Sequence, residues 1–551
     1  MFFREKKVKD RSYLQIVENN RVNGRTQQRV IGTLGRLDHL RDSGKLDDLI
    51  TSGAKFSEKI MVLNAHREGS LHETSKLRIG GPLVFERLWK ETGCRDAIRN
   101  LIQDRKIQFD IERAIFTTVL HRLFDPGSDR ACEKWMKNYS IHDTSELQLQ
   151  HFYRAMAWLG EEQKDTGTSI KEKIEEELFQ KRHDLFSSID MVFFDTTSIY
   201  FEGEGGETIG QYGHSKDHRP DLKQMVVGAV LDERGRPVCC ELWPGNMADV
   251  ISLIPVAERL KKRFGISQSC IVADRGMISS GTLNWLEDKK HQRPYILGAR
   301  MRKQKEVSEE VLSRAGRYEE VYGERKKHGD PSPLKVKEVW VDDRRYIVCY
   351  NEDQAEKDRD DREKILVSLE ESLKNGSKSL VGNKGYRKYL KVSGQSFEID
   401  IDKAVQEERY DGKWVLRTNT TLPAREVALK YKQLWMVEDL FRSLKSVLDT
   451  RPIYHKCDET IRGHVFCSFL AMVLMKDLKY RLETEGNNLE WSDIIQDLDS
   501  LEELELEQSG KRFILRTGLS GCAGEVFRAA GVALPPTIRK IDNENAVPTS
   551  F

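Results

Sequence analysis

The sequence predicts a protein of the α/β class, built on a mixed sheet, with a helical region before the sheet and a strand-rich insertion within it. Two observations lead to this prediction. Between residues 181 and 300, short apolar runs typical of buried strands alternate with amphipathic segments. Between residues 75 and 180, apolar residues recur at helical spacing instead. The chain of 551 residues is long enough for about three or four domains.

The composition limits the kinds of partner that the chain could bind. Hydrophobic residues make up 38% of the sequence, and the formal net charge is only +1, so a nucleic-acid surface would need local clusters of basic residues. The nine cysteines include no CxxC pair, which gives no support to a zinc finger or a disulfide framework. The longest apolar run, residues 465–475, is too short for a membrane span, and residues 4–11 are too charged for a secretory signal. We expect a cytoplasmic protein.

The N-terminal segment is locally basic. Residues 1–36 carry nine Lys and Arg against three Asp and Glu. Residues 13–17 and 26–31 are strand-like, and Asn23-Gly24 between them is a strong hairpin signal, because both residues tolerate positive φ. We interpret residues 1–60 as a basic hairpin arm, which would either lie on DNA or pack on the body of the protein.

The next segment has a helical pattern. Apolar residues fall on one side of two expected helices, at Ile111, Ala114, Ile115, Val119 and Leu120 and at Tyr153, Met156 and Leu159. Basic residues surround the Pro126-Gly127 turn, namely Arg122, Arg130, Lys134 and Lys137. We interpret residues 75–180 as a helical DNA-binding region, although any helical bundle would show the same pattern.

Residues 181–300 predict the order β-β-β-α-β-α-β. The strands are expected at residues 189–194, 225–231, 237–243, 270–273 and 295–299, and the helices at residues 249–264 and 279–290. A tight turn at residues 232–235 joins the second and third strands. This antiparallel meander, followed by alternating helices and strands, is the order that an RNase H-like mixed sheet requires.

Three segments complete the expected organisation. Residues 301–415 are interpreted as an inserted α/β segment, with strands at 338–350 and 396–401 and a charged helix at 353–374. Residues 416–481 return to the sheet domain as two apolar helices. Residues 482–551 form a C-terminal tail, for which dimerisation is one candidate role, and its acidic stretch at 497–507 is interpreted as a solvated helix face.

Two carboxylates stand at the ends of expected strands. Asp195 follows the apolar run of the first strand, and Asp274 follows the fourth. In the predicted order these strands are parallel neighbours, so both carboxylates would emerge side by side. Two like charges at one rim repel each other unless a cation neutralises them. The alternative is a pair of strand-end caps or surface salt bridges.

A third acid lies on an expected helix. Tyr431, Glu438 and Lys445 are seven residues apart, so one continuous helix would place them on one face, with Arg442 nearly on the same face. A carboxylate, a phenol and two cations suit a phosphodiester backbone. The alternative is a simple i,i+4 salt bridge between Glu438 and Arg442.

Carboxylates from two strands and a helix match the arrangement that holds two metal ions ~3.5–4 Å apart for in-line displacement at phosphorus. Few oxygen ligands suit Mg²⁺ or Mn²⁺, and no histidine cluster indicates zinc. The sequence therefore predicts Asp195, Asp274 and Glu438 as catalytic residues and as ligands of two such ions.

Three motifs, FFDTTS, IVADRGM and Y-x2-L-W-x2-E-x6-K, together resemble those of bacterial insertion-sequence transposases of the DDE class. The chain looks most similar to the group marked by a Y-R-E-K signature, over most of residues 110–480. By motif match, the family's catalytic acids fall on Asp195, Asp274 and Glu438, and its Tyr and Lys on Tyr431 and Lys445. The signature's Arg position is Leu434 here, a departure for which Arg442 could compensate.

Further DNA contacts are expected beside this signature. His214, Lys216 and Arg219 lie in the polar run YGHSKDHRPD, which could equally be a flexible loop. Trp435 is a candidate for stacking on a flipped base, with a core position as the alternative. The resemblance also implies DNA-binding roles for Tyr431, Lys445 and Arg442.

The resemblance implies a cut-and-paste DNA transposase. Such an enzyme nicks DNA at terminal inverted repeats, and the freed 3′-OH then attacks target DNA. In related enzymes the 3′-OH first attacks the opposite strand and makes a hairpin, and a strand-rich insertion is associated with that route. It implies a homodimer on DNA, close to the nucleoid of a bacterial cytoplasm, and no membrane. Two alternatives are an RNase H-like nuclease without strand transfer and a catalytically silent DNA-binding regulator derived from a transposase.

Overall fold

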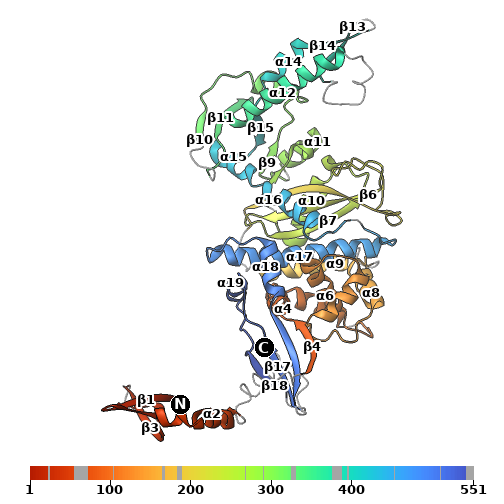
Figure 1. Cartoon of the computed structure of the whole chain (residues 1–551). Helices are drawn as coiled ribbons and strands as arrows, with labels where there is room; N and C mark the ends of the chain where they lie inside the picture. The colour runs from red at the N-terminus through yellow and green to blue at the C-terminus, as the bar shows by residue number, and fades with distance from the viewer. Residues whose placement is uncertain are drawn as a thin grey trace. The chain divides into compact units, whose positions relative to one another are not determined.

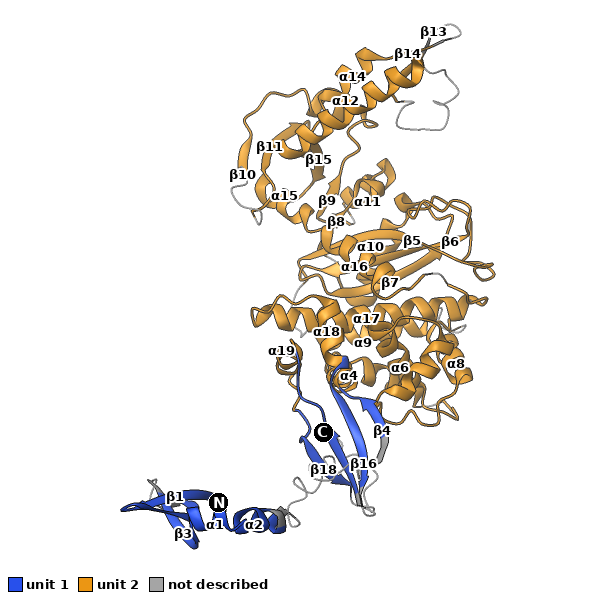
Figure 2. Ribbon diagram, in the orientation of Figure 1, with its two compact units in different colours: residues 1–79, 499–520, 534–551 blue, residues 80–498, 521–533 orange. Residues whose placement is uncertain are grey.

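The computed structural model of the chain describes residues 1–22, 25–54, 72–103, 105–163, 168–182, 189–266, 268–289, 291–323, 330–374, 388–393, 396–451, 453–508 and 511–541. Two sequence predictions fall partly outside the described residues: the hairpin turn at Asn23 and Gly24, and the end of the helix predicted at 279–290, at Lys290. The chain divides into two compact units (Figure 2). None of the helices in the described ranges is both long and apolar enough to cross a membrane.

The first unit, residues 1–79, 499–520 and 534–551, contains two antiparallel sheets. One has the order β1-β2-β3, from Phe2–Val8, Arg11–Val22 and Arg25–Arg36, and is followed by helices α1 (Leu37–Asp42) and α2 (Lys45–Ala54). The other has the order β18-β17-β16-β4, from Ile538–Ile541, Lys511–Arg516, Glu502–Gln508 and His72–Arg78. The pairing of β2 with β3 confirms the predicted hairpin strands, which are longer than expected.

The second sheet corrects two sequence predictions. Residues 75–78 belong to strand β4 and not to a helix. The acidic stretch at 497–507 is not a helix face, because most of it forms strand β16. Its residues alternate, as a strand requires: Leu504 and Leu506 pack with the buried Phe513, while Glu503 pairs with Arg539.

The helical region begins the second unit, residues 80–498 and 521–533. Its helices are α4 (Gly80–Glu91), α5 (Cys94–Ile102), α6 (Ile111–Phe124), α7 (Asp129–Trp135), α8 (Leu149–Leu159) and α9 (Ile170–Arg182). Asp110 caps α6 by accepting a hydrogen bond from the Arg113 amide, and 13 of the 14 residues of α6 are buried. The predicted helical character of this region is confirmed from Gly80 onward.

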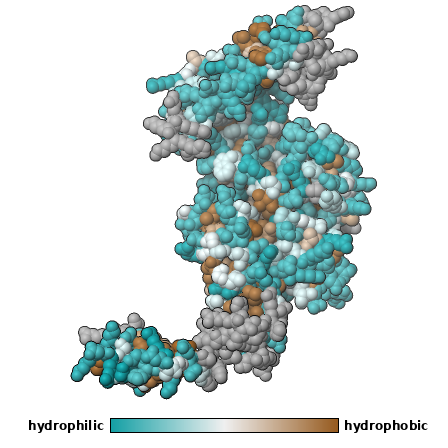
Figure 3. Space-filling view, in the orientation of Figure 1, coloured by the Kyte–Doolittle hydropathy of each residue, from teal (hydrophilic) through white to brown (hydrophobic). Residues whose placement is uncertain are grey.

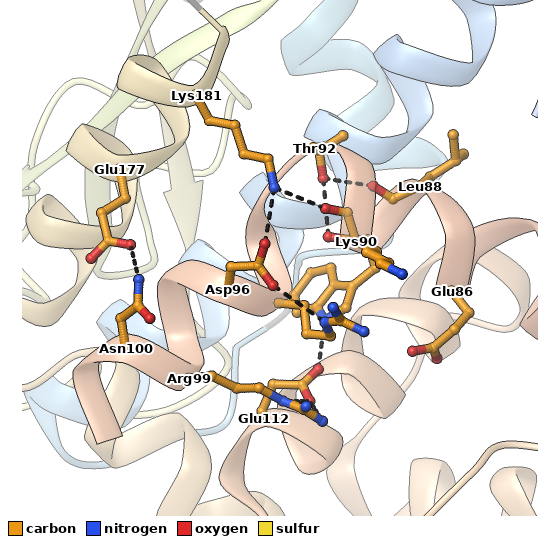
Figure 4. Close-up of polar contacts among 12 residues, drawn as sticks. Glu86, Leu88, Lys90, Thr92, Asp96, Arg99, Asn100, Glu112, Glu177 and Lys181 are labelled. Atoms are coloured by element: carbon orange, nitrogen blue, oxygen red, sulfur yellow. Dashed lines mark hydrogen bonds and ion pairs between the residues drawn. The ribbon is translucent and has the colours of Figure 1, made fainter. Parts of the chain in front are cut away.

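Polar contacts tie the helices of this region together (Figure 4). Lys181 Nζ on α9 donates to Asp96 Oδ2 on α5 at 3.0 Å and to the Lys90 carbonyl at 3.2 Å. The fully buried Glu112 on α6 accepts from Trp89 Nε1 at 2.7 Å and pairs with Arg99. A buried charge is stable only when such donors surround it, so the contacts of Glu112 hold α5 to α4 and α6. The pair of Lys181 with Asp96 is exposed and links α9 to α5 at the surface.

Helix α17 (Asp458–Thr484) joins the helical region to the sheet, because it packs on α6 and α8 and also on strand β7. Two glycines allow its close approach to α8. A Cβ at Gly463 would meet the Met156 carbonyl oxygen, and one at Gly160 would meet the Glu459 carbonyl oxygen. The backbones of the two helices are therefore in contact at this crossing. Helices α18 (Trp491–Asp499) and α19 (Ala523–Ala529) complete the bundle.

The central sheet contains the predicted RNase H-like order. Strands β5 (Met191–Tyr200), β6 (Gln224–Asp232) and β7 (Pro237–Pro244) form an antiparallel meander, and β8 (Cys270–Ala273) and β9 (Tyr295–Gly298) run parallel to β5. Their side-by-side order is β7-β6-β5-β8-β9. Strands β6, β7 and β9 are labelled in Figure 1, and β5 and β8 in Figure 2. Gly235 has a φ of +73° in the tight turn before β7, as that turn requires.

The intervening helices cover this sheet and are shorter than predicted. Helix α10 (Leu253–Phe264) follows a 3₁₀ turn at Asp249–Ile251 and ends at Gly265, which adopts a φ of +69°. Helix α11 (Ser280–Glu287) starts after Ser279, whose hydroxyl caps it. The apolar faces of both helices join the core under strands β5 to β9.

The insertion does not stand apart from the sheet. Strands β15 (Lys413–Thr418), β12 (Arg344–Tyr350), β11 (Leu334–Val341) and β10 (Glu319–Tyr322) continue it beyond β9, giving nine strands among the described residues. Every one of these added pairings is antiparallel. The predicted α/β content is confirmed, but the single strand predicted at 338–350 is wrong, because these residues form the end of β11 and all of β12, paired as a hairpin. The sequence also did not indicate that most of the strands extend the central sheet.

The outer part of the insertion consists of helix α12 (Glu352–Lys374), helix α14 (Ile401–Glu408) and the small hairpin β13 (Leu390–Ser393) with β14 (Ser396–Ile399). Helix α14 begins at Ile401, so the strand predicted at 396–401 ends earlier than expected. On the face shown in Figure 3, the described surface is mainly hydrophilic, with small separate apolar patches.

Candidate active site

Asp195 and Asp274 are brought together by strand pairing. Strands β5 and β8 are parallel, with Phe194 opposite Ala273, so the next residue of each chain segment is one of the two acids. Strand β8 ends there, and Asp274 begins the 3₁₀ turn Arg275–Met277. Asp195 does not end its strand as predicted, because β5 continues to Tyr200 along its other neighbour, β6. The two acids therefore lie side by side as predicted, but Asp195 lies in the middle of β5 and not at its end.

The environment of Asp195 disfavours its charged form. Burial raises the pKa of the Asp195 carboxyl to about 6, against the lowering effect of Lys216 and of the Thr196 amide, which donates to Oδ1 at 2.7 Å. The negative charges of Asp274 and Asp249 raise this pKa further. A carboxylate in this position is one that an additional cation would stabilise.

Tyr431 orients Asp274. Its hydroxyl donates to Asp274 Oδ1 at 2.9 Å, and burial together with the charge of Asp274 raises the pKa of Tyr431, which keeps the hydroxyl protonated as a donor. Gly298 makes room for this contact. A Cβ at Gly298 would meet the Tyr431 hydroxyl and would lie 2.9 Å from the Arg275 amide nitrogen. The absence of a side chain at Gly298, the end of β9, therefore allows Tyr431 to reach Asp274.

Replacing Gly298 with alanine is expected to displace the Tyr431 hydroxyl from Asp274 and to lower the rate of DNA cleavage by about 10–100-fold, the usual loss when the partner of a ligand is removed. The rate is measured in single-turnover assays. Gly281→Ala is the matched control, since a Cβ there meets only Ser279 Oγ, at 3.8 Å. Full activity of Gly298→Ala would show that the Tyr431 contact is dispensable.

Glu438 faces the same space as the two aspartates. It lies on helix α16 (Trp435–Ser446), which packs on β5 and β6, and it lines a cavity of about 540 Å³ together with Asp195, Asp274 and Tyr431. The expected alternative, a salt bridge to Arg442, is not found among the described residues. Arg442 lies instead 3.8 Å from Asp439.

The predicted single helix face for Tyr431 and Glu438 is wrong. Tyr431 and Glu438 do not lie on one continuous helix, because α15 (Ala424–Lys432) ends before α16 begins. Amides 433 and 434 donate three residues back, as in a 3₁₀ turn, instead of four. Both side chains still line the cavity, since the two helices meet at this break. Leu434, at the signature's Arg position, is buried at the break.

The predicted DNA contacts have different surroundings. Trp435 is 60% exposed, so the alternative of a core position is wrong. Arg442 and His214 are also exposed. Arg219 forms an ion pair with Asp221 at 2.9 Å and lies over the Tyr200 ring. Lys216 and Lys445 each form an ion pair with an acid of the protein itself.

Sequence reasoning missed a second, basic cavity next to the first. It measures about 720 Å³ and shares Asp274, Arg275, Met301 and Arg302 with the first cavity. Its other charged lining residues are Lys216, Asp249, Arg300, Lys303 and His214. Arg275 is exposed, and the described residues offer it no ion-pair partner. The only sequence signal was its place directly after Asp274.

The donor atoms present fit a hard divalent cation. Asp195 Oδ2, Asp274 Oδ2 and both oxygens of Glu438 accept no hydrogen bond from any described residue, and oxygen donors are what Mg²⁺ and Mn²⁺ prefer. Within the described part of the chain, however, no three His, Cys, Asp or Glu side chains lie close enough together to form a metal-binding group. Glu438 thus shares the cavity of the two aspartates without completing a ligand cluster.

Comparisons with known proteins point to one family. A family model described as a transposase DDE domain matches residues 187–474, more than half of the chain, and a model described as the N-terminal domain of IS1634 family transposases matches residues 3–66. Among solved structures, the cryo-EM structure of a piggyBac transposase synaptic complex with hairpin DNA is 9% identical, with 76% of this chain and 77% of that chain covered. Its TM-score of 0.36 is too low to carry an argument. The comparison with curated proteins gave no match.

Proposed function

Because this chain belongs to the family of insertion-sequence transposases with a DDE domain, we propose that it cuts DNA at the ends of its element and joins the freed 3′ ends to target DNA. The observation that carries this proposal is the placement of Asp195 and Asp274 side by side in a cavity that Glu438 also lines. Both family matches concern transposases, and the DDE match spans all three acids.

We propose that Asp195, Asp274 and Glu438 hold two Mg²⁺ or Mn²⁺ ions. Such ions, when bound, activate the attacking oxygen and stabilise the leaving oxygen of a phosphodiester. The protein's own groups prepare this site: Tyr431 fixes one oxygen of Asp274, and the Thr196 amide fixes one oxygen of Asp195. In each aspartate, the other oxygen accepts no hydrogen bond from a described residue, which leaves it available to an ion.

The exposed groups around the cavities are proposed to bind DNA. Trp435 begins the helix of Glu438 and presents its indole to solvent, which supports a role in stacking on an unpaired base. Arg442, His214 and Arg219 are exposed cationic or ionisable side chains, of which Arg219 would have to leave Asp221. Arg275 joins this set, since it lines both cavities. For Tyr431 we favour the orientation of Asp274 over direct DNA contact.

The remaining segments receive proposed roles. We assign residues 1–60 and 75–180 to binding of the terminal inverted repeats, in keeping with the basic charge of the first segment. The C-terminal residues 482–551 are assigned to a homodimer on DNA, since two ends must be joined. The strand-rich insertion supports a hairpin route of cleavage.

The test uses a labelled duplex that contains one end of the element. Purified protein is incubated with the duplex and Mg²⁺, beside a control with EDTA, and the products are separated on denaturing gels. Metal-dependent nicking at the element boundary, followed by joined or hairpin products, is expected. Nicking alone would indicate a nuclease without strand transfer, and binding without cleavage would indicate a silent regulator.

A further inference from the structure

The loop between β5 and β6 is attached to the strand of Asp195 through Lys216. The Lys216 amide donates to Ser198 Oγ at 2.8 Å, and its ammonium donates to the carbonyl and hydroxyl oxygens of Thr196 at 2.7 and 2.9 Å. The same ammonium lies 3.0 Å from Asp249 Oδ2, and the Thr196 hydroxyl donates to the other oxygen of Asp249 at 2.6 Å. All these contacts are made directly beside Asp195.

The next residue, Asp217, attaches the same loop to the helix of Glu438. Its Oδ1 accepts a hydrogen bond from Lys445 Nζ on α16 at 2.8 Å and forms an ion pair with Arg451 at 2.8 Å. The side chains of Asp217 and Lys445 are only 9% and 13% exposed. Arg451 also lies over the ring of Tyr200, the last residue of β5.

These contacts differ from those of a phosphate-binding lysine awaiting DNA. Lys445 forms a mostly buried ion pair with Asp217, an acid of the protein itself. Burial lowers the pKa of Lys445, against the raising effect of Asp217. Breaking a buried pair by removing one partner leaves an uncompensated charge, so the contact is strongly retained. The chain segment after α16 reinforces it, because Ile453 forms a bridge with Phe201, just beyond β5.

We propose that the adjacent residues Lys216 and Asp217 act as a bracket that holds the strand of Asp195 and the helix of Glu438 in one arrangement. Lys216 contacts the strand through Thr196 and Asp249. Asp217 contacts the helix through Lys445 and the segment after it through Arg451. In this bracket Lys445 is a positioning residue. The inference rests on the proposed function, because it concerns the spacing of the proposed ligands.

The test compares Asp217→Asn, Lys445→Met and the double variant with wild type. Asp221→Asn is the matched control, being the same chemical change in the same loop, where Asp221 pairs only with Arg219 among the described residues. Four quantities are measured: thermal midpoint, affinity for an end-containing duplex with its salt dependence, single-turnover cleavage rate, and Mn²⁺ affinity from the electron paramagnetic resonance of the free ion without DNA.

The bracket predicts that each single variant loses about 10–100-fold in cleavage rate and binds Mn²⁺ more weakly, while end binding stays as in wild type. The double variant is expected to be no worse than either single one, since both remove the same contact. Asp221→Asn should keep the thermal midpoint, the cleavage rate and the Mn²⁺ affinity of wild type, and its end binding should equal or exceed that of wild type, because the change releases Arg219 from its ion pair. Because Mn²⁺ affinity is measured without cleavage, a wild type that binds Mn²⁺ but never cuts would refute the proposed function and leave the bracket testable.

The opposite pattern would overturn the inference. If Lys445→Met weakens end binding and reduces its salt dependence, while Asp217→Asn tightens binding, Lys445 is a DNA contact that Asp217 merely covers. Unchanged Mn²⁺ affinity in both single variants would also overturn it. So would an equal loss in Asp221→Asn, which would show that any change in the loop has the same effect.

Discussion

The rate of end cleavage is expected to fall by more than about 100-fold in each of three variants, Asp195→Asn, Asp274→Asn and Glu438→Gln. This loss is larger than the one that usually follows when the hydrogen-bond partner of a metal ligand is removed. Each change preserves the shape of the side chain and removes its charge. The affinity for end-containing DNA should stay close to that of wild type, since none of these groups is proposed to bind phosphate directly. Cleavage is followed on denaturing gels, and binding by gel shift.

Asp402→Asn is the control for this series, because Asp402 is an exposed acid at the start of α14, in the insertion. It should cleave as wild type does. If binding falls in step with cleavage in the three site variants, the acids support the DNA-bound structure and are not ligands. If only one of the three has no effect, that residue leaves the proposed set.

Gly463→Ala is expected to destabilise the protein by about 3 kcal/mol or more, at the upper end of the cost of overpacking. The added Cβ would meet the Met156 carbonyl oxygen, and because that neighbour is backbone, no rotamer change relieves the contact. Gly160→Ala should have a similar effect at the other side of the same crossing. The expected fall in thermal midpoint is about 3 °C or more, because the entropy of unfolding grows with the size of the unit that unfolds.

Gly518→Ala is the matched control for these variants, since nothing lies within 4 Å of a Cβ there and the residue is exposed. Its melting curve should overlay that of wild type. A Gly463→Ala protein that melts like wild type would mean that α8 and α17 can separate without cost, and the tight crossing would lose its importance.

The sequence predicted what depends on local patterns. Strand β8 occupies the residues expected from its apolar run, and β6 and β7 extend only slightly beyond theirs. The adjacency of Asp195 and Asp274 followed from strand order, which is itself a consequence of the β-β-β-α-β pattern. The break between α15 and α16 was not visible, because neither Gln433 nor Leu434 is a helix breaker.

Contacts between residues far apart in the chain could not be predicted from the sequence. Asp217 and Lys445 are 228 positions apart, and neither type of residue announces its partner. Asp249 belongs to no motif, and only the fold brings it to Thr196. The predicted DNA-binding role of Lys445 came from a signature, which records the type of residue and not its neighbours. The pairing of β15 with β9 was hidden for the same reason.

The continuation of the sheet through β15 and β12 has a consequence for how the insertion can move. Rigid-body hinge motion needs a boundary that few backbone hydrogen bonds cross, but here β9 and β15 share a ladder, and the core of the insertion includes Ala299, Val348 and Val415. The insertion therefore transmits strain to the strand that holds Gly298 instead of swinging free of it. Excising residues 301–415 would remove β12 and expose the outer backbone edge of residues 416–418, which pair with β9. The insertion is therefore part of the cooperative unit and not a module that can be exchanged.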